Sequence, residues 1–261
     1  MSSKRIKKIK QGLHKIIMAL PGGRVLLRSR ATARARRRFK RRGFTEIGGA
    51  KEVFQHHYES NTWRNAESVS GSGSTIQYTE NIQKIIPQLA EELGVQVFLD
   101  APCGDYNWFR KVEWNTPVSY VGGDIVEPLI ERNNSLYGAD STTFINLDIT
   151  NDDLPKADMW LCRDCLFHLS EHDIFMALDN FLKSDIHYLL TSIHPECDLN
   201  SDIPTGSYRD LNLLLPPFSL GKPIREIDDW VEGHPVRRLG LWERKAVEDA
   251  LATNKAFQRI K

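Results

Sequence analysis

The sequence predicts an α/β protein with a doubly wound, mostly parallel sheet. Short apolar runs alternate with segments of helical periodicity between residues 97 and 193, as parallel strands joined by crossover helices require. Three of the runs end in acidic side chains, at Asp100, Asp124 and Asp148, and a fourth ends in polar residues before a helix. Ligands of open α/β sheets bind outside the carboxyl ends of the strands, so these ends mark the expected site.

The first 43 residues form a basic arm, because they contain 16 Lys and Arg and no Asp or Glu. The rest of the chain has 19 basic and 34 acidic residues. Apolar residues recur at helical spacing from Ile6 to Leu20, and a second basic segment, residues 24–42, follows Pro21. We therefore expect residues 1–45 to form an amphipathic arm with an anionic partner.

An anionic membrane surface, contacted through residues 4–42, is favoured over nucleic acid as that partner. The arm pairs its charges with a row of isoleucines, whereas only Phe39 and Phe44 offer rings for base stacking. A solvated arm that only aids solubility or assembly is the alternative. No apolar run reaches the roughly 18 residues of a membrane span, and four cysteines are too few for a disulfide scaffold. We expect a cytoplasmic protein, either free or peripheral on the inner face of the cytoplasmic membrane.

Residues 46–94 are expected to form a helical cover ahead of the first strand. Helical spacing marks residues 79–93, which include Pro87, and a short helix is expected within residues 52–63. Residues 67–75 are rich in Gly and Ser, which is typical of a flexible linker.

Residues 97–108, VFLDAPCGDYNW, predict a strand, a tight turn and the start of a helix at residues 106–113. A dinucleotide site would place G-x-G-x-x-G at this turn, so that backbone N–H groups meet a pyrophosphate. The turn instead has Asp105 at the expected N-cap, where it would repel a phosphate. Asp100 and Asp105 suit a ligand with a positive centre and no phosphate, which describes S-adenosylmethionine.

The alternation continues with apolar runs at residues 119–126, 144–150 and 157–170 and a fifth strand at residues 187–193. Helices are expected at residues 128–137 and 171–183. Residues 197–222 form a long, polar, turn-rich segment, and such segments are usually functional or disordered. A short helix at residues 227–231 and a last strand at residues 238–242 follow.

The chain resembles the class I S-adenosylmethionine-dependent methyltransferases, which have a Rossmann-like fold. D-x-P-C-G-D at residues 100–105 stands in place of their acidic-x-G-x-G-x-G, with two glycines missing, and the strand ends agree in order over residues 98–190. The resemblance implies S-adenosylmethionine as the cofactor, with Gly104 near its methionine half, Asp124 on the ribose and Asp148 at the adenine. The implied cofactor-binding residues are Asp100, Pro102, Gly104, Asp105, Trp108, Asp124, Ile125, Asp148, Ile149 and Arg163.

The same resemblance implies that residues 95–261 form the methyltransferase domain. It also offers a second interpretation of the Gly/Ser-rich segment, as a loop that covers the cofactor through Trp63, Ser70, Gly71 and Ser74; a plain linker is the alternative. Little chain remains for the sixth and seventh strands that this family usually has.

Methyl transfer is an in-line displacement, so alignment of the acceptor is the main requirement. A hydroxyl acceptor would also use a general base within about 3 Å. Arg163, Asp164 and His168 are the catalytic candidates, and we expect Asp164 to orient the imidazole of His168 across one helical turn. The alternative for His168 is that it caps or packs its helix. His194 is a second candidate base, although a lone histidine is more often structural.

We expect residues 197–222 to form a lid over the acceptor. The candidate substrate contacts are His194, Asp202, Tyr208, Arg209 and Asn212, which suit a polyhydroxylated or phosphorylated acceptor. The pattern of residues 200–218, with L-G-L-W at residues 239–242, is similar to that of bacterial methyltransferases associated with surface-glycan synthesis. This finer resemblance implies a sugar hydroxyl or phosphate of a glycan or glycolipid as the acceptor.

Three alternatives stay open: an RNA methyltransferase anchored by the arm, a small-molecule methyltransferase, and a non-catalytic binding protein with the same fold. A metal site at Cys162 and Cys165 is not expected, because the chain has no second pair of ligands at suitable spacing. The sequence does not indicate the oligomeric state.

Overall fold

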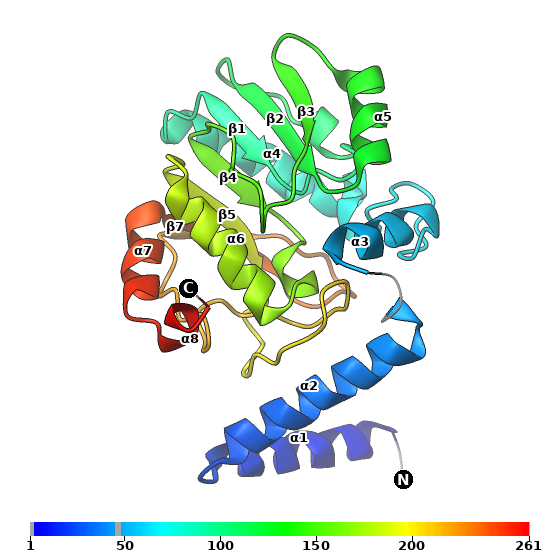
Figure 1. Cartoon of the computed structure of the whole chain (residues 1–261), viewed down its shortest axis with the longest axis vertical. Helices are drawn as coiled ribbons and strands as arrows, with labels where there is room; N and C mark the ends of the chain where they lie inside the picture. Colours follow the sequence, from blue (N-terminus) through cyan, green and yellow to red (C-terminus); the bar gives the residue numbers. More distant parts are fainter. Residues whose placement is uncertain (1–2, 45–47, 261) are drawn as a thin grey trace.

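The computed structural model describes residues 3–44 and 48–260, without the side chains of residues 3–8, 10 and 11. Its strands are β1 (Val97–Asp100), β2 (Ser119–Asp124), β3 (Thr142–Asn146), β4 (Met159–Cys162), β5 (Tyr188–Ile193), β6 (Arg225–Asp228) and β7 (Arg238–Glu243). They form one sheet in the order β3-β2-β1-β4-β5-β7-β6 (Figure 1). Strands β1 to β5 are parallel, whereas β7 is antiparallel to β5 and β6. The predicted doubly wound, mostly parallel sheet is confirmed.

The helices are α1 (Ser3–Ala19), α2 (Gly23–Arg41), α3 (Ala50–Glu59), α4 (Ile76–Glu92), α5 (Glu127–Tyr137), α6 (Glu171–Lys183), α7 (Arg244–Ala252) and α8 (Lys255–Gln258). Short 3-10 helices occur at Ser72–Ser74, Phe109–Lys111 and Leu166–His168. Local capping sets two of the helix starts. The hydroxyl of Thr75 accepts a hydrogen bond from the backbone of Tyr78 in α4, and Ser170 does the same for Asp173 in α6.

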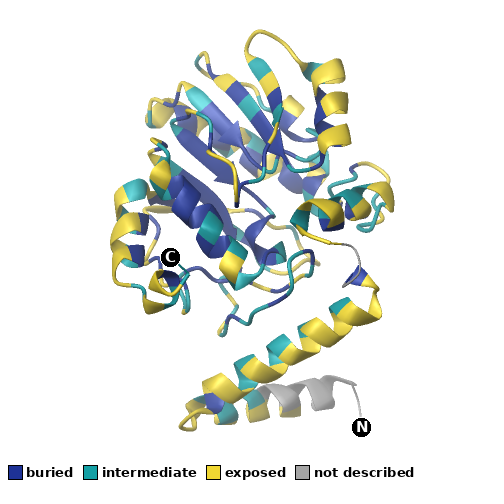
Figure 2. Cartoon of the chain, viewed as in Figure 1, coloured by how far each residue is buried: buried dark blue, intermediate teal, exposed yellow. Residues whose placement is uncertain are grey.

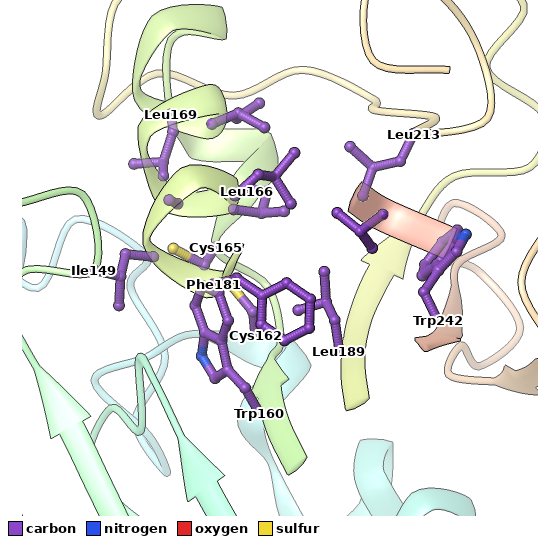
Figure 3. Close-up of a cluster of buried hydrophobic side chains, with 14 of the residues drawn as sticks. Ile149, Trp160, Cys162, Cys165, Leu166, Leu169, Phe181, Leu189, Leu213 and Trp242 are labelled. Atoms are coloured by element: carbon purple, nitrogen blue, oxygen red, sulfur yellow. The ribbon is translucent and has the colours of Figure 1, made fainter. Parts of the chain in front are cut away.

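The sheet is buried on both faces by apolar side chains. Leu99 of β1 contributes to the cluster beneath α6 and α7, and the next residue back, Phe98, contributes to the opposite cluster beneath α4. Figure 3 shows the first cluster, in which Trp160, Phe181 and Trp242 come from β4, α6 and β7. Because both faces are covered, a ligand can reach the parallel strands only at their ends.

Two predicted helices are wrong. Residues 106–113 form turns and one 3-10 helix, because Tyr106 has φ +57°, a conformation that a right-handed helix does not allow. Ile227 lies in β6, which pairs with β7 instead of forming a helix. The chain therefore does supply the sixth and seventh strands, which the sequence had left in doubt: β7 and β6 form this edge of the sheet.

Helices α1 and α2 form a hairpin that projects from the sheet domain (Figure 1), and most of its described surface is exposed (Figure 2). Its ion pairs with the domain join Arg36 to Asp202 at 3.4 Å and His14 to Asp198 at 3.2 Å, and Arg28 to Glu171. Among residues 3–44 and 48–260, no helix is long and apolar enough to cross a membrane. The predicted boundary between arm and cover, at residues 45–46, lies outside the described residues.

Candidate active site

A cavity of about 980 Å³ opens at the carboxyl ends of β1, β2 and β4. Its size is at the upper end of the range for small-molecule sites. Nine of the ten predicted cofactor-binding residues line it: Asp100, Pro102, Gly104, Trp108, Asp124, Ile125, Asp148, Ile149 and Arg163. The structure therefore brings together side chains from four strand ends that are far apart in sequence, while their roles stay predictions.

Asp124, the last residue of β2, holds the turn after β1 in place. One of its carboxylate oxygens accepts the backbone N–H of Gly104 at 3.1 Å and the other accepts that of Val126 at 3.0 Å. Burial raises the pKa of Asp124 to about 6. Gly104 has φ +55°, and a Cβ at this position would lie 2.2 Å from Oγ of Ser70. Glycine is required here both by the backbone conformation and by the closeness of Ser70.

Asp100, the last residue of β1, is a buried carboxyl group on the cavity wall. It is 2% exposed, and one carboxyl oxygen accepts the hydroxyl proton of Tyr120 at 2.8 Å. Burial raises the pKa of Asp100 to about 7. A cationic ligand would favour the ionised form, so this carboxyl group suits a positively charged ligand.

Asp105, the tenth predicted residue, lies outside the cavity wall. Its carboxylate accepts hydrogen bonds from Oγ of Ser68 at 2.9 Å and from the backbone of Val69 at 3.0 Å. The side chain therefore fastens the Gly/Ser-rich segment to the turn instead of capping a helix. Held in this way, the segment covers the cavity, which is lined by all four of its predicted contacts: Trp63, Ser70, Gly71 and Ser74.

Arg163 follows β4 and joins three parts of the site. It donates two hydrogen bonds to Asp229, both at 2.9 Å, and a third to the carbonyl of Gly73 at 2.7 Å. Its guanidinium also lies over the ring of Trp108, 5.3 Å from the ring centre. Through these contacts Arg163 holds the covering segment against the end of the sheet.

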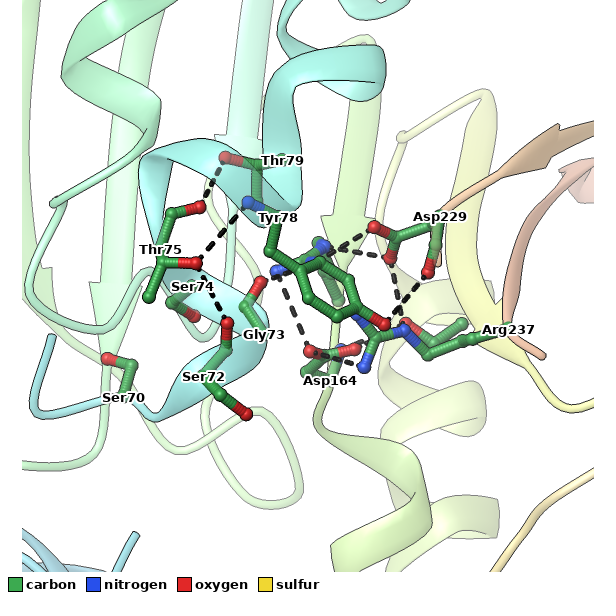
Figure 4. A network of polar contacts seen from close by, with 12 residues as sticks. Ser70, Ser72, Gly73, Ser74, Thr75, Tyr78, Thr79, Asp164, Asp229 and Arg237 are labelled. Atoms are coloured by element: carbon green, nitrogen blue, oxygen red, sulfur yellow. Dashed lines mark hydrogen bonds and ion pairs between the residues drawn. The ribbon is translucent and has the colours of Figure 1, made fainter. Parts of the chain in front are cut away.

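Arg237 supplies a donor that the protein itself leaves unused. Its Nε lies 3.2 Å from Asp229 and its Nη1 2.9 Å from Asp164 (Figure 4). Its Nη2 is buried and has no hydrogen-bond partner among the described residues, although Arg237 lines the cavity. A buried donor without a partner costs about 1–3 kcal/mol, so this N–H is an unsatisfied group next to the cavity.

Asp164 stays ionised in this network. Burial alone would raise the pKa of Asp164, but the adjacent guanidinium groups of Arg163 and Arg237 lower it overall. Its carboxylate also accepts a hydrogen bond from Ser192 at 3.1 Å. The network thus pairs two acidic side chains, Asp164 and Asp229, with two basic ones, Arg163 and Arg237.

His168 has one ring nitrogen available to a ligand. Its Nδ1 lies 2.8 Å from the carbonyl oxygen of Ser207, and because a carbonyl can only accept, Nδ1 must carry the proton. Nε2 then has a free lone pair. Burial lowers the pKa of His168 to about 4, so the ring is neutral at pH 7. The expected orienting partner, Asp164, is replaced by Ser207, because Asp164 is bonded to Arg237 and Ser192.

His194 has both nitrogens engaged. Its Nδ1 accepts the backbone N–H of Leu211 at 3.2 Å, so Nε2 carries the proton, 3.4 Å from the hydroxyl oxygen of Tyr208. Tyr208 in turn donates to Asp210 at 2.8 Å. Without a free lone pair, His194 is less suited than His168 to accept a proton.

Only a small part of the predicted lid reaches the cavity. Of the five predicted substrate contacts, His194 and Tyr208 line it. The other three hold the fold together: Asp202 accepts the backbone N–H of Glu171, Arg209 donates to the carbonyl of Leu169, and Asn212 donates to that of Cys197. Leu211, Leu213 and Phe218 are fully buried, so part of residues 197–222 belongs to the core rather than to a lid.

Three residues of the polar network around Arg163 were not anticipated: Tyr78, Asp229 and Arg237. The ring of Tyr78 lies 4.9 Å from the guanidinium of Arg237. Asp229 and Arg237 flank the turn between β6 and β7, one position beyond the paired residues Asp228 and Arg238. Asp229 and Arg237 come together only because β6 pairs with β7, and no local sequence pattern indicates that pairing.

No protein-family model matches the chain, and no curated protein matches its sequence. Solved structures do match in fold. Magnesium protoporphyrin IX methyltransferase from Synechocystis PCC 6803, with bound SAM, has a TM-score of 0.52 and 15% identity over 76% of this chain and 98% of its own. The N-methyltransferase NodS from Bradyrhizobium japonicum WM9, with S-adenosylhomocysteine, has a TM-score of 0.54 and 12% identity over 72% and 97%.

The Burkholderia thailandensis 1,6-didemethyltoxoflavin-N1-methyltransferase, with its named substrate and S-adenosylhomocysteine, has a TM-score of 0.52 and 15% identity over 73% of this chain and 87% of its own. At such identities the likeness concerns the fold. The Rossmann-like fold of class I methyltransferases, expected from the strand ends, is confirmed.

Proposed function

We propose that the chain is an S-adenosylmethionine-dependent methyltransferase that acts on a hydroxyl group of a polar acceptor. The observation that carries the proposal is one cavity lined both by the acidic strand ends at Asp124 and Asp148 and by the side chains of His168 and Arg237. One end suits a cationic nucleoside and the other suits an oxygen nucleophile, as methyl transfer requires.

The acidic end fits the cofactor in charge and in shape. Asp124 keeps acceptor capacity for ribose hydroxyls, because each carboxylate oxygen has two lone pairs. Asp148 and Ile149 would hold the adenine, with Ile125 and Pro102 as apolar walls. Asp100 would offset the positive charge. The backbone of Gly104 and the covering segment would enclose the methionine half.

The polar end supplies alignment and a base. When bound next to Asp100 and Gly104, S-adenosylmethionine would supply an electrophilic methyl group: the acceptor oxygen would bond to its carbon while the sulfur kept the electron pair of the broken carbon–sulfur bond. The hydroxyl proton passes to Nε2 of His168, which is unprotonated at neutral pH. The side chains of Arg237 and Tyr208, which line this end of the cavity, would orient the acceptor.

A sugar unit of a bacterial surface glycan or glycolipid is the acceptor we propose, with its hydroxyl or phosphate as the site of transfer. The lining near His168 supports this choice. It offers His, Tyr, Arg and Trp side chains rather than a flat aliphatic slot, and carbohydrate rings combine hydroxyls with one apolar face.

The test compares a variant of His168, whose Nε2 is the proposed base, with a variant of His194, whose two ring nitrogens are both engaged. His168→Asn keeps a donor toward Ser207 but removes Nε2, so radiolabelled methyl transfer into bacterial glycolipid extracts should fall about 10²- to 10⁴-fold. His194→Asn is the matched control and should change the rate far less, because that ring has no free lone pair. Binding of S-adenosylhomocysteine should be unchanged in both variants. Equal rates for His168→Asn and the natural protein would contradict the assignment of the base.

A further inference from the structure

The hairpin of α1 and α2 carries an exposed apolar row. Ile9, Leu13, Ile16 and Leu20 are spaced by four, three and four residues and therefore share one face of α1 and the turn that follows it. Their exposed fractions are 54%, 55%, 61% and 56%. At the start of α2, Val25 and Leu26 extend the row with 69% and 45% exposed. Six of the ten most exposed large apolar side chains among the described residues thus lie on this hairpin.

The hairpin that carries this row is also strongly basic. Residues 1–43 contain 16 Lys and Arg without one acidic side chain. In α2 and the turn after it, eight basic residues are exposed in addition to the Arg28 and Arg36 that form ion pairs with the domain: Arg24, Arg30, Arg34, Arg37, Arg38, Lys40, Arg41 and Arg42. A partner must therefore offer both negative charge and an apolar layer over the length of the hairpin.

We propose that the hairpin is a docking surface for an anionic lipid bilayer. A lipid surface combines anionic headgroups with acyl chains a few ångströms deeper, which fits a hairpin that carries both exposed cations and an aliphatic row. Nucleic acid provides the charge but gains little from exposed Leu and Ile, because bases stack on aromatic rings. None of the described helices can cross a membrane, so the hairpin lies along the surface.

The position of the hairpin links the bilayer to the cavity. Arg42 and Phe44, at the C-terminal end of the hairpin, line the cavity, and Phe44 packs against His57 with ring centres 5.1 Å apart. The end of the hairpin opposite to Val25 and Leu26 therefore contacts the cavity wall, and a docked hairpin tethers the cavity to the lipid surface. If the proposed methyl transfer holds, the acceptor is one that is presented at that surface.

The test is co-sedimentation of the full chain with vesicles of phosphatidylcholine alone or of equal parts phosphatidylcholine and phosphatidylglycerol. The natural protein should bind the anionic vesicles and not the neutral ones. Leu13→Ser with Ile16→Ser removes part of the apolar row without a change in charge, and should weaken binding at physiological salt by roughly tenfold or more. Leu136→Ser with Ile224→Ser, which alters exposed apolar residues on the domain, is the matched control and should bind as the natural protein does.

Equal vesicle binding by the Leu13→Ser, Ile16→Ser variant and the natural protein would overturn the proposal. The proposal would also be overturned if the natural protein bound RNA but not vesicles, or if it formed a dimer through the hairpin and did not bind vesicles. Binding of S-adenosylhomocysteine is measured in parallel and should not change in the hairpin variant. If the natural protein binds vesicles but does not bind S-adenosylhomocysteine, the proposed function is refuted and the proposed docking surface still stands.

Discussion

Replacement of Asp100 by Asn should stabilise the ligand-free protein at neutral pH while it weakens cofactor binding. The group is 2% exposed, and burial raises its pKa to about 7 from 3.8 in the unfolded chain. That difference of about 3 pKa units, at about 1.4 kcal/mol each, corresponds to about 4 kcal/mol of unfolding free energy. Asn keeps an oxygen that can accept the hydrogen bond from Tyr120.

The sign of the pH dependence follows from proton binding. Between pH 4 and pH 7 the native state holds a proton on Asp100 that the unfolded state has released, so the stability of the natural protein falls as the pH rises. The Asn variant lacks this loss. Its advantage should therefore grow by about 1.4 kcal/mol per pH unit over this range and level off above pH 7.

The assay is urea unfolding of both proteins at several pH values from 5 to 8.5, without ligand. The slope of the difference against pH is the test, because it does not depend on any fixed difference between Asn and a protonated Asp. If the difference in unfolding free energy between the two proteins stays constant over this pH range, Asp100 is not a buried carboxyl group with a raised pKa. Calorimetric titration should show weaker binding of S-adenosylmethionine to the variant, by about 10- to 100-fold.

Two further substitutions test other parts of the site. Gly104→Ala should reduce affinity for S-adenosylhomocysteine in calorimetry at least tenfold, because its Cβ would meet Ser70, whereas Gly94→Ala has a similar positive φ with no atom nearby and should leave affinity unchanged; equal affinities would contradict this role. Asp229→Asn should lower the free energy of unfolding by about 3–5 kcal/mol, since two buried guanidinium groups then share the single carboxylate of Asp164. In the exposed pair with Arg238, Glu226→Gln should cost less than about 1 kcal/mol in the same urea assay, and similar losses for both variants would be the adverse result.

The sequence was enough to predict that the site lies at the carboxyl ends of the strands. Parallel strands all end on the same side of the sheet, and a polar residue follows each apolar run where its strand ends. Asp100, Asp124 and Asp148 are each the polar end of an apolar run, and the structure brings all three to one cavity. The fold followed from the same alternation of apolar runs and helical segments.

Contacts between distant segments were beyond this reasoning. Asp105 has the sequence features of an N-cap, and only the position of Ser68, 37 residues earlier, shows that it fastens the covering segment. In the same way, Ser207 orients His168 from 39 residues away. Residues 197–222 lack any periodicity, so their polar composition predicted a lid although Leu211 and Phe218 are core residues.

Isothermal titration of the purified protein with S-adenosylhomocysteine, repeated with NAD and with the Asp124→Ala variant, tests the central claim most directly. We expect saturable one-to-one binding of S-adenosylhomocysteine, no binding of NAD, and loss of binding in the variant. Failure of the natural protein to bind S-adenosylhomocysteine would contradict the assignment of the cavity to this cofactor.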